Sequence, residues 1–226
     1  GHSNLAMGER LLRRKDYGKA VEYLDRAIRE NPRLSTAYLA RSDAYAHLGD
    51  YDKQIDDLTK VIELEPNNFC ALGNRGHARH YQQRFEQVLD DYDKAISLDS
   101  QNAVIYELRA EVHIALKHHV DALTDANKSI ELDRGNGWSH CVRGQAHQAL
   151  KNHDRALADF DEAVRLSPQD ERVYYYRSYF HDWMERYEEA LRDADRAVEL
   201  APDTVDCVVN RVWANLGALR FDRALE

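Results

Sequence analysis

Apolar side chains recur at helical spacing in two consecutive segments of residues 35–68. The first segment carries the apolar residues Ala37, Tyr38, Ala44, Tyr45 and Leu48, which predict a helix over residues 36–48. Gly49-Asp50 interrupts this pattern, and the second segment begins at Tyr51. It carries Ile55, Leu58, Val61 and Ile62, which predict a helix that ends near Leu64. Pro66 follows, and because proline cannot continue a helix, the segment reads as one helix pair with a stop.

The same pattern returns at a fixed period along the chain, equal to the spacing from Arg41 to Arg75. Three residue types mark the period: arginine at 41, 75, 109, 143, 177 and 211, leucine at 64, 98, 132, 166 and 200, and aspartate at 57, 91, 125, 159 and 193. The predicted units are residues 1–34, 35–68, 69–102, 103–136, 137–170 and 171–204, followed by a partial unit at residues 205–226. A period of this length indicates one helix pair repeated along a single solenoid domain, in which each copy buries its apolar face against its neighbours.

This pattern resembles the tetratricopeptide repeat, and the resemblance covers essentially the whole chain. An aromatic residue stands early in the first helix at Tyr38, Tyr106 and Tyr174, followed four positions later by a small residue at Ser42, Ala110 and Ser178. Small residues recur in the second helix at Ala20, Ala122, Ala156 and Ala190, and closing prolines stand at Pro32, Pro66, Pro168 and Pro202. The resemblance implies an all-α fold: a right-handed superhelical solenoid of stacked antiparallel helix pairs.

The first five arginines of the period are each followed by an aspartate at a constant spacing, and a common form of the repeat has leucine at the arginine position. The pairs are Arg41–Asp57, Arg75–Asp91, Arg109–Asp125, Arg143–Asp159 and Arg177–Asp193. Residues equally distant from the turn of an antiparallel hairpin lie level with each other, and guanidinium meets carboxylate bidentately. We therefore expect a structural ladder of ion pairs. The alternative is that these arginines bind an acidic ligand, but buried charges generally occur in pairs.

Composition and charge narrow the classes of function. Lys and Arg number 31 against 40 Asp and Glu, for a net charge of -9, which argues against nucleic acid as a partner. No apolar stretch approaches the ~18 residues that a membrane span needs. The three cysteines, Cys70, Cys141 and Cys207, form no CxxC pair, which favours reduced thiols and a cytoplasmic location.

The sequence contains no catalytic motif, so we expect a non-enzymatic protein without a cofactor. Eleven histidines raise a metal hypothesis, in which His77 and His80 meet His47 and Glu111 from neighbouring helices. Because no recognised ligand spacing is present, we predict no metal site. His113, His147 and His181 stand where the family commonly packs tyrosine, and they are expected to be half-buried packing residues.

The candidate site follows from the resemblance, since extended peptides often lie in the concave wall that the first helices of the repeats build. Toward the C-terminus this wall presents Trp138, Arg172, Tyr175, Tyr176, Tyr179, Trp183, Asn210 and Trp213. Tyr175, Tyr179 and Trp183 share one helix face, and clustered Tyr and Trp beside Arg are typical of interface hot spots. The alternative is that these rings pack against the next repeat or a further helix.

The sequence therefore predicts a protein-interaction scaffold that holds an extended peptide or a partner helix in its groove. Two alternatives remain open. One is self-assembly through the C-terminal repeats as a homo-oligomer, and the other is a regulatory domain of a larger protein with its catalytic part elsewhere. Ala224 and Leu225 are expected to begin the second helix of the partial unit, so we expect a fragment of a longer protein.

Overall fold

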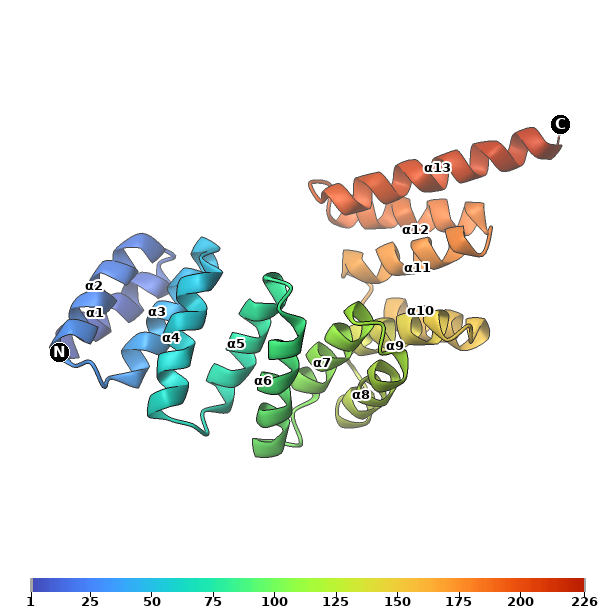
Figure 1. The fold of residues 1–226 in the computed structure, drawn as a ribbon. Coiled ribbons are helices and arrows are strands. Elements are labelled where there is room, and N and C mark those ends of the chain that lie inside the picture. The colour runs from blue at the N-terminus through green and yellow to red at the C-terminus, as the bar shows by residue number, and fades with distance from the viewer. Residues whose placement is uncertain (1, 226) are drawn as a thin grey trace. The chain divides into compact units, whose positions relative to one another are not determined.

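The computed structural model describes the backbone of residues 2–225 and the side chains of residues 3–219, and within that range it contains thirteen helices and no strand (Figure 1). The helices are α1 (His2–Arg13), α2 (Tyr17–Glu30), α3 (Ser35–Leu48), α4 (Tyr51–Leu64), α5 (Phe69–Tyr81), α6 (Phe85–Leu98), α7 (Ala103–Ala115), α8 (His119–Leu132), α9 (Gly137–Ala149), α10 (His153–Leu166), α11 (Glu171–Trp183), α12 (Tyr187–Leu200) and α13 (Val205–Leu225). The predicted all-α repeat fold is confirmed.

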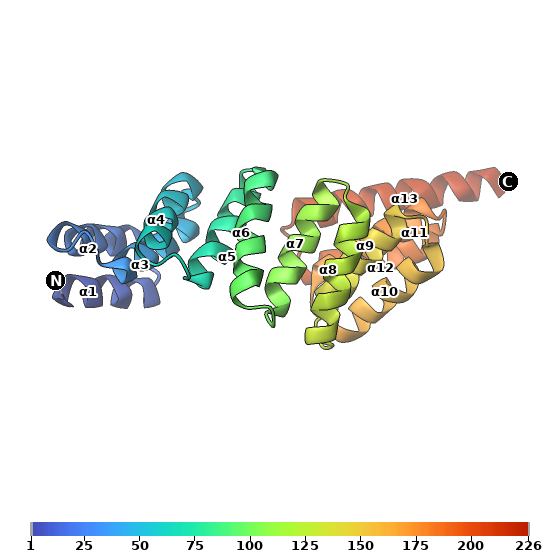
Figure 2. The same ribbon diagram turned by 60° about the horizontal axis from the view of Figure 1, so that its bottom comes forward.

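The helices form two compact units, of which the first ends at Val112 and the second begins at His113. In the first unit each helix from α1 to α6 packs on the next along the chain, and in the second unit the same holds from α8 to α13. Figure 2 shows the pairs α9–α10 and α11–α12 packed together in the second unit. That the period forms one uninterrupted solenoid domain stays a prediction. No helix of residues 2–225 is both long and apolar enough to cross a membrane.

The turn inside each helix pair places one residue in the left-handed region of backbone conformation, always at the same position of the period. These residues are Lys15, Gly49, Gln83, Lys117, Lys151 and Glu185, with φ between 58° and 73°. Aspartate caps the next helix after two of these turns, since the carboxylates of Asp16 and Asp50 accept from the backbone N–H groups of Lys19 and Lys53. The predicted break at Gly49-Asp50 is therefore a left-handed residue followed by an N-cap.

The last helix corrects one prediction. The sequence suggests a turn before Ala224, but α13 is a single helix from Val205 to Leu225. Leu219 occupies the repeat position that is left-handed in the earlier turns, and a branched side chain disfavours that conformation. The helix therefore continues where the other repeats turn. The side chains of Ala224 and Leu225 lie outside the described residues.

Small residues on the first helix of a pair face large residues on the second. A Cβ added at Gly76 would lie 2.4 Å from the ring of Tyr92, and one added at Gly144 would lie 3.0 Å from the ring of Phe160. In both cases the glycine directly follows an arginine of the period, and the ring directly follows the aspartate paired with that arginine. Because the large rings are fully buried, this fit closes the core between paired helices.

Four of the predicted ion pairs are bidentate in the structure: Arg41–Asp57, Arg75–Asp91, Arg143–Asp159 and Arg177–Asp193. In Arg143–Asp159, for example, Nε donates to Oδ2 over 2.9 Å and Nη2 donates to Oδ1 over 2.6 Å. The aspartate side chains are at most 9% exposed. These carboxylates are therefore buried charges with a paired guanidinium.

Each arginine also reaches the preceding repeat through Nη1. Arg143 donates to Asn127, and Arg177 donates to Asp161. Arg109, of the fifth predicted pair, donates to Asp93 in the same way. The guanidinium fork thus joins the two helices of one repeat and ties them to the repeat before it, which a leucine at this position would not do.

Candidate functional site

The most exposed aromatic surface of the second unit lies on the first helices of its repeats. α9 contacts α11, and α11 contacts α13, so these three helices form one face. Tyr179 of α11 is 55% exposed and Trp213 of α13 is 60% exposed on this face, whereas Phe180 of α11 is buried in the core. The helical spacing of 175, 179 and 183 thus separates surface rings from core rings as predicted.

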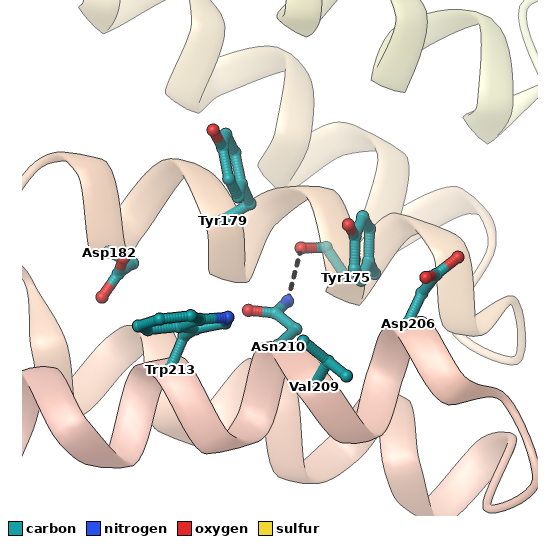
Figure 3. Close-up of a pocket in the computed structure, with 7 residues that line it drawn as sticks. All are labelled: Tyr175, Tyr179, Asp182, Asp206, Val209, Asn210 and Trp213. Atoms are coloured by element: carbon teal, nitrogen blue, oxygen red, sulfur yellow. Dashed lines mark hydrogen bonds between the residues drawn. The ribbon is translucent and has the colours of Figure 1, made fainter.

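A pocket of about 350 Å³ opens between α11 and α13 (Figure 3). Its lining residues are Tyr175, Tyr179 and Asp182 of α11 and Asp206, Val209, Asn210 and Trp213 of α13. Figure 3 shows Asp182 and Trp213 toward one end of the pocket and Tyr175 and Asp206 toward the other. The pocket therefore combines aromatic walls with two carboxylates. We call it the α11–α13 pocket.

Burial and negative charge set the electrostatics of this pocket. Burial raises the pKa of Asp182 above its usual value. The pKa of Tyr175 is raised first by burial and then by the negative charge of Asp206. Burial also raises the pKa of Cys207, with further contributions from Glu171 and Asp206. Among the described residues that line the pocket, none carries a positive charge. The pocket is thus an acidic aromatic site.

Asn210 joins two helices in addition to lining the pocket. It lines the pocket, but it is only 7% exposed. Its Nδ2 donates to the carbonyl of Tyr175 over 3.1 Å, and its Oδ1 accepts from the hydroxyl of Ser178. These bonds connect α13 to α11, so Asn210 positions the pocket walls, and its contact with a partner stays a prediction.

A second pocket, of about 420 Å³, lies on the other side of Tyr179 between α9 and α11. Its lining residues are Ile114, Gln145, Gln148, Ala149, Lys151, Tyr176, Tyr179 and Trp183. The amides of Gln145 and Gln148 are hydrogen-bonding groups of the kind that pair with an extended backbone. Because Tyr179 lines both pockets, its ring stands between two neighbouring depressions on one face. We call this second depression the α9–α11 pocket.

Three of the predicted residues, Trp138, Arg172 and Tyr176, contact one another. The guanidinium of Arg172 lies 4.1 Å from the ring centroid of Trp138, and it also pairs with Asp170. Tyr176 meets the edge of Trp138 at 5.6 Å between centroids. Trp138 and Tyr176 are partly buried against the core around Phe160. The alternative that the aromatic residues pack against neighbouring repeats therefore fits Trp138 and Tyr176 better than it fits Tyr179 or Trp213.

Trp183 is shared between packing and surface. It is 51% exposed, but its ring lies 4.8 Å from that of His153 in the preceding repeat. The same two repeat positions stack in the first unit, where Tyr17 contacts His47 and Tyr51 contacts Tyr81. The ring of Trp183 thus belongs to a series of contacts between neighbouring repeats as well as to the α9–α11 pocket.

Sequence reasoning missed the carboxylates Asp182 and Asp206 and the amides Gln145 and Gln148. The period contained a usable signal, because Gln145 stands one repeat before Tyr179, and Asp206 stands one repeat after Arg172. For Asp182 the sequence gave no such signal. This residue lies on the side of α11 against which α13 packs, and it lines the pocket from there.

The histidines that raised the metal hypothesis are engaged in ring contacts. Tyr17 stacks on His47, and His77 meets Tyr81 edge to face. Within the described residues, one group of possible ligands comes together elsewhere, at His113, His118 and Asp121, with ligand atoms within 4.8 Å of one another. Histidine nitrogen and carboxylate oxygen are ligand types that zinc accepts, and exposed acidic groups such as Asp121 are also common without a metal, so the absence of a metal site stays a prediction.

Comparison with known proteins places the fold. Two sequence profiles described as tetratricopeptide repeat match residues 5–69 and 138–170. No curated protein matches the sequence. A tetratricopeptide repeat protein from Parabacteroides merdae is 18% identical with a TM-score of 0.86, over 99% of this chain and 88% of that one.

Two further solved structures share the fold at low identity. YrrB, described as a TPR protein with an unusual peptide-binding site, is 19% identical with a TM-score of 0.60, over 83% of this chain and 97% of its own. A chain of the APC/C hetero-tetramer Cut9–Hcn1 is 15% identical with a TM-score of 0.77. The match covers 93% of this chain and 42% of that one, so this chain spans less than half of it.

Proposed function

The chain is a tetratricopeptide-repeat protein, and from this premise we propose that its second unit binds an extended peptide across α9, α11 and α13. The fold as such favours a protein-interaction scaffold. The peptide, and the face it occupies, are the finer proposal. One observation supports it above the others: two pockets lie side by side on this face, and Tyr179 lines both.

The two pockets match the needs of an extended chain. Successive side chains of such a peptide alternate in direction, so those on one side can enter neighbouring depressions while the backbone crosses Tyr179. Gln145 and Gln148 lie where they can bond backbone amides, and Tyr179 supplies a large ring that loses little conformational freedom on binding. Trp213 adds an exposed ring at the far side. The proposal assigns no reaction and no cofactor to the chain.

The test is selection from a random 12-residue peptide library, followed by fluorescence anisotropy on the selected sequences. We expect Tyr179→Ala to weaken binding at least tenfold, about the effect of removing a hot-spot ring. Tyr81→Ala is the matched control, because Tyr81 is similarly exposed, at 60% against 55% for Tyr179, but lies in the first unit. Equal losses in both variants, or selected peptides that ignore both substitutions, would place binding elsewhere.

Self-assembly is a second candidate, favoured by a different face. Val205, Val212, Leu216 and Leu219 leave an exposed apolar stripe along α13. Two copies that pair these stripes would bury it. Light scattering over a hundredfold range of concentration tests this, with Val212→Glu as the disrupting variant. A constant monomer mass for the wild type rules the candidate out.

The proposal has two further parts. One is that this chain is the regulatory part of a larger protein, and the other is that it is located in the cytoplasm. The location rests on the three free cysteines, of which Cys70 is exposed and Cys141 and Cys207 are buried. Microscopy of the tagged endogenous protein tests it.

A further inference from the structure

We propose that the α11–α13 pocket takes a cationic side-chain end, the ammonium of a lysine or the guanidinium of an arginine, from the bound peptide. This inference rests on the proposed function, whose site it makes chemically specific. Two features of the pocket support it, the pair of carboxylates and the three aromatic rings that line the same space.

The carboxylates of the pocket have no counter-charge among the side chains of residues 3–219. In the second unit the buried Asp159 and Asp193 each pair with an arginine. Asp182 and Asp206 form no ion pair within the part of the chain that the structure describes. Asp182 is half-buried and Asp206 is exposed. A half-buried carboxylate such as Asp182 is stabilised by a positive partner, because removal from water is unfavourable for an isolated charge. A guest cation would supply that partner.

The rings around these carboxylates favour the same guest. Tyr175, Tyr179 and Trp213 line one pocket, and the face of an aromatic ring attracts a cation within about 6 Å of its centroid. The chain already shows this contact, since Arg172 lies over Trp138 at 4.1 Å. An acidic guest would meet two carboxylates, and a purely apolar guest would leave both of them unpaired at the pocket wall.

Other charges near the pocket strengthen the preference. Glu171 acts together with Asp206 on the buried thiol of Cys207, so a third carboxylate lies close to the same end of the pocket. The remaining polar lining group, Asn210, uses its amide to join α13 to α11. These hydrogen bonds connect the two helices that form the pocket walls, and such a connection lowers the entropy lost on binding.

A small-molecule titration tests the pocket without any peptide. Tetramethylammonium and the neutral tert-butyl alcohol, of similar shape, are added to the ¹⁵N-labelled protein. The indole N–H signal of Trp213, identified as the one missing from Trp213→Phe, reports binding. We expect a saturable shift at millimolar tetramethylammonium and a shift at least fivefold smaller with tert-butyl alcohol.

Matched variants connect the shift to the carboxylates. Asp182→Asn and Asp206→Asn keep the side-chain shape and remove the charge, and each is expected to weaken the cation about threefold to tenfold. Asp203→Asn is the control, because Asp203 is exposed and lies outside the pocket. Equal shifts with both probes, or unchanged cation binding in the double variant, overturn the proposal. Thermal unfolding of each variant establishes that it is folded.

A peptide arm separates this inference from the function it rests on. Peptides selected by the wild type are remade with norleucine in place of each lysine or arginine, and we expect one such position to lose at least tenfold in affinity. If the protein binds tetramethylammonium at Trp213 but selects no peptide, the cation pocket is supported and the proposed peptide binding is wrong. If the peptides bind equally well after every replacement, peptide binding is supported and the proposed cation pocket is wrong.

Discussion

The first and second units build the same helix-pair framework but present different surfaces on it. Both contain the bidentate arginine–aspartate pairs and the fit of glycine against a buried ring. At the repeat position of Tyr179, however, the first unit carries Glu9, Asp43, His77 and Glu111, whereas the second carries Gln145, Tyr179 and Trp213. The framework positions and the surface positions therefore vary separately, and a binding face can be changed without altering the fold that supports it.

The largest expected difference between the two units is in the stability lost when an arginine of an ion pair is removed. In the first unit Asp91 accepts from both Arg75 and Arg79, whereas among the described residues of the second unit Asp159 has Arg143 as its only arginine. Arg143→Leu leaves a buried carboxylate with histidine contacts alone, so we expect a loss of about 3 kcal/mol in the free energy of unfolding. Arg75→Leu should lose less than half of that. Urea unfolding measures both, and equal losses would mean that Arg79 does not compensate.

The pKa values of the paired carboxylates show the same dependence on neighbours. Burial raises the pKa of Asp57 above its usual value despite the hydrogen bonds from Arg41. Burial also acts on Asp159, but the hydrogen bonds from His140 and Arg143 hold the pKa of that carboxyl below its usual value. The two carboxylates thus differ in their neighbours: the negative charges of Asp25 and Asp56 act on Asp57, and His140 acts on Asp159.

The next largest difference between the two units is expected where a glycine packs against a buried ring. Gly76→Ala places a methyl group 2.4 Å from the Tyr92 ring, and Gly144→Ala places one 3.0 Å from Phe160. We expect the first to destabilise the protein by about 1–3 kcal/mol and the second by clearly less, since overpacking forces buried rings to shift. Thermal unfolding compares the two. The double variant Gly76→Ala/Tyr92→Leu should recover part of the loss, and failure to recover would point to the backbone instead.

The two buried rings themselves offer a smaller test. The Tyr92 hydroxyl is buried without a hydrogen-bond partner among the described residues, and Phe160 stands at the equivalent position of the second unit. Tyr92→Phe should therefore stabilise the protein by about 1 kcal/mol, because it removes an unsatisfied polar group. Phe160→Tyr should have the opposite effect. A loss of stability in Tyr92→Phe would show that the hydroxyl has a partner in solution.

The smallest expected effect is a dependence on pH that both units share. Burial lowers the pKa of His77 and His80 in the first unit, and of His147 and His181 in the second. A histidine with a lowered pKa in the folded state binds its proton more readily when unfolded. Its contribution to stability is therefore present above pH 6.5 and is lost as pH falls below that value.

Melting temperatures at pH 7.5 and 5.5 measure this dependence. We expect a lower midpoint at pH 5.5, and a smaller difference in His147→Gln/His181→Gln than in the wild type. His118→Gln, which removes an exposed imidazole, is the variant measured for comparison. A midpoint that rises at pH 5.5 would contradict the assigned direction.

The helices, their period and the partners of the arginines could all be predicted from spacing along the chain. Apolar periodicity defined the two helices of residues 35–68 to within one residue. Equal distance from the turn paired Arg143 with Asp159, as the structure has them. Local rules suffice for such features, since both partners lie on helices that one short turn joins.

The composition of the site, in contrast, emerges from contacts between repeats. Asp182 and Asp206 line one pocket from two different repeats, and neither stands out by residue type in a chain with 40 acidic residues. Asn210 and Trp183 occupy surface positions of the period, yet one bonds α11 and the other packs on His153. Whether a side chain faces a partner or a neighbouring repeat depends on how closely adjacent helices approach, and that distance is set by packing between repeats.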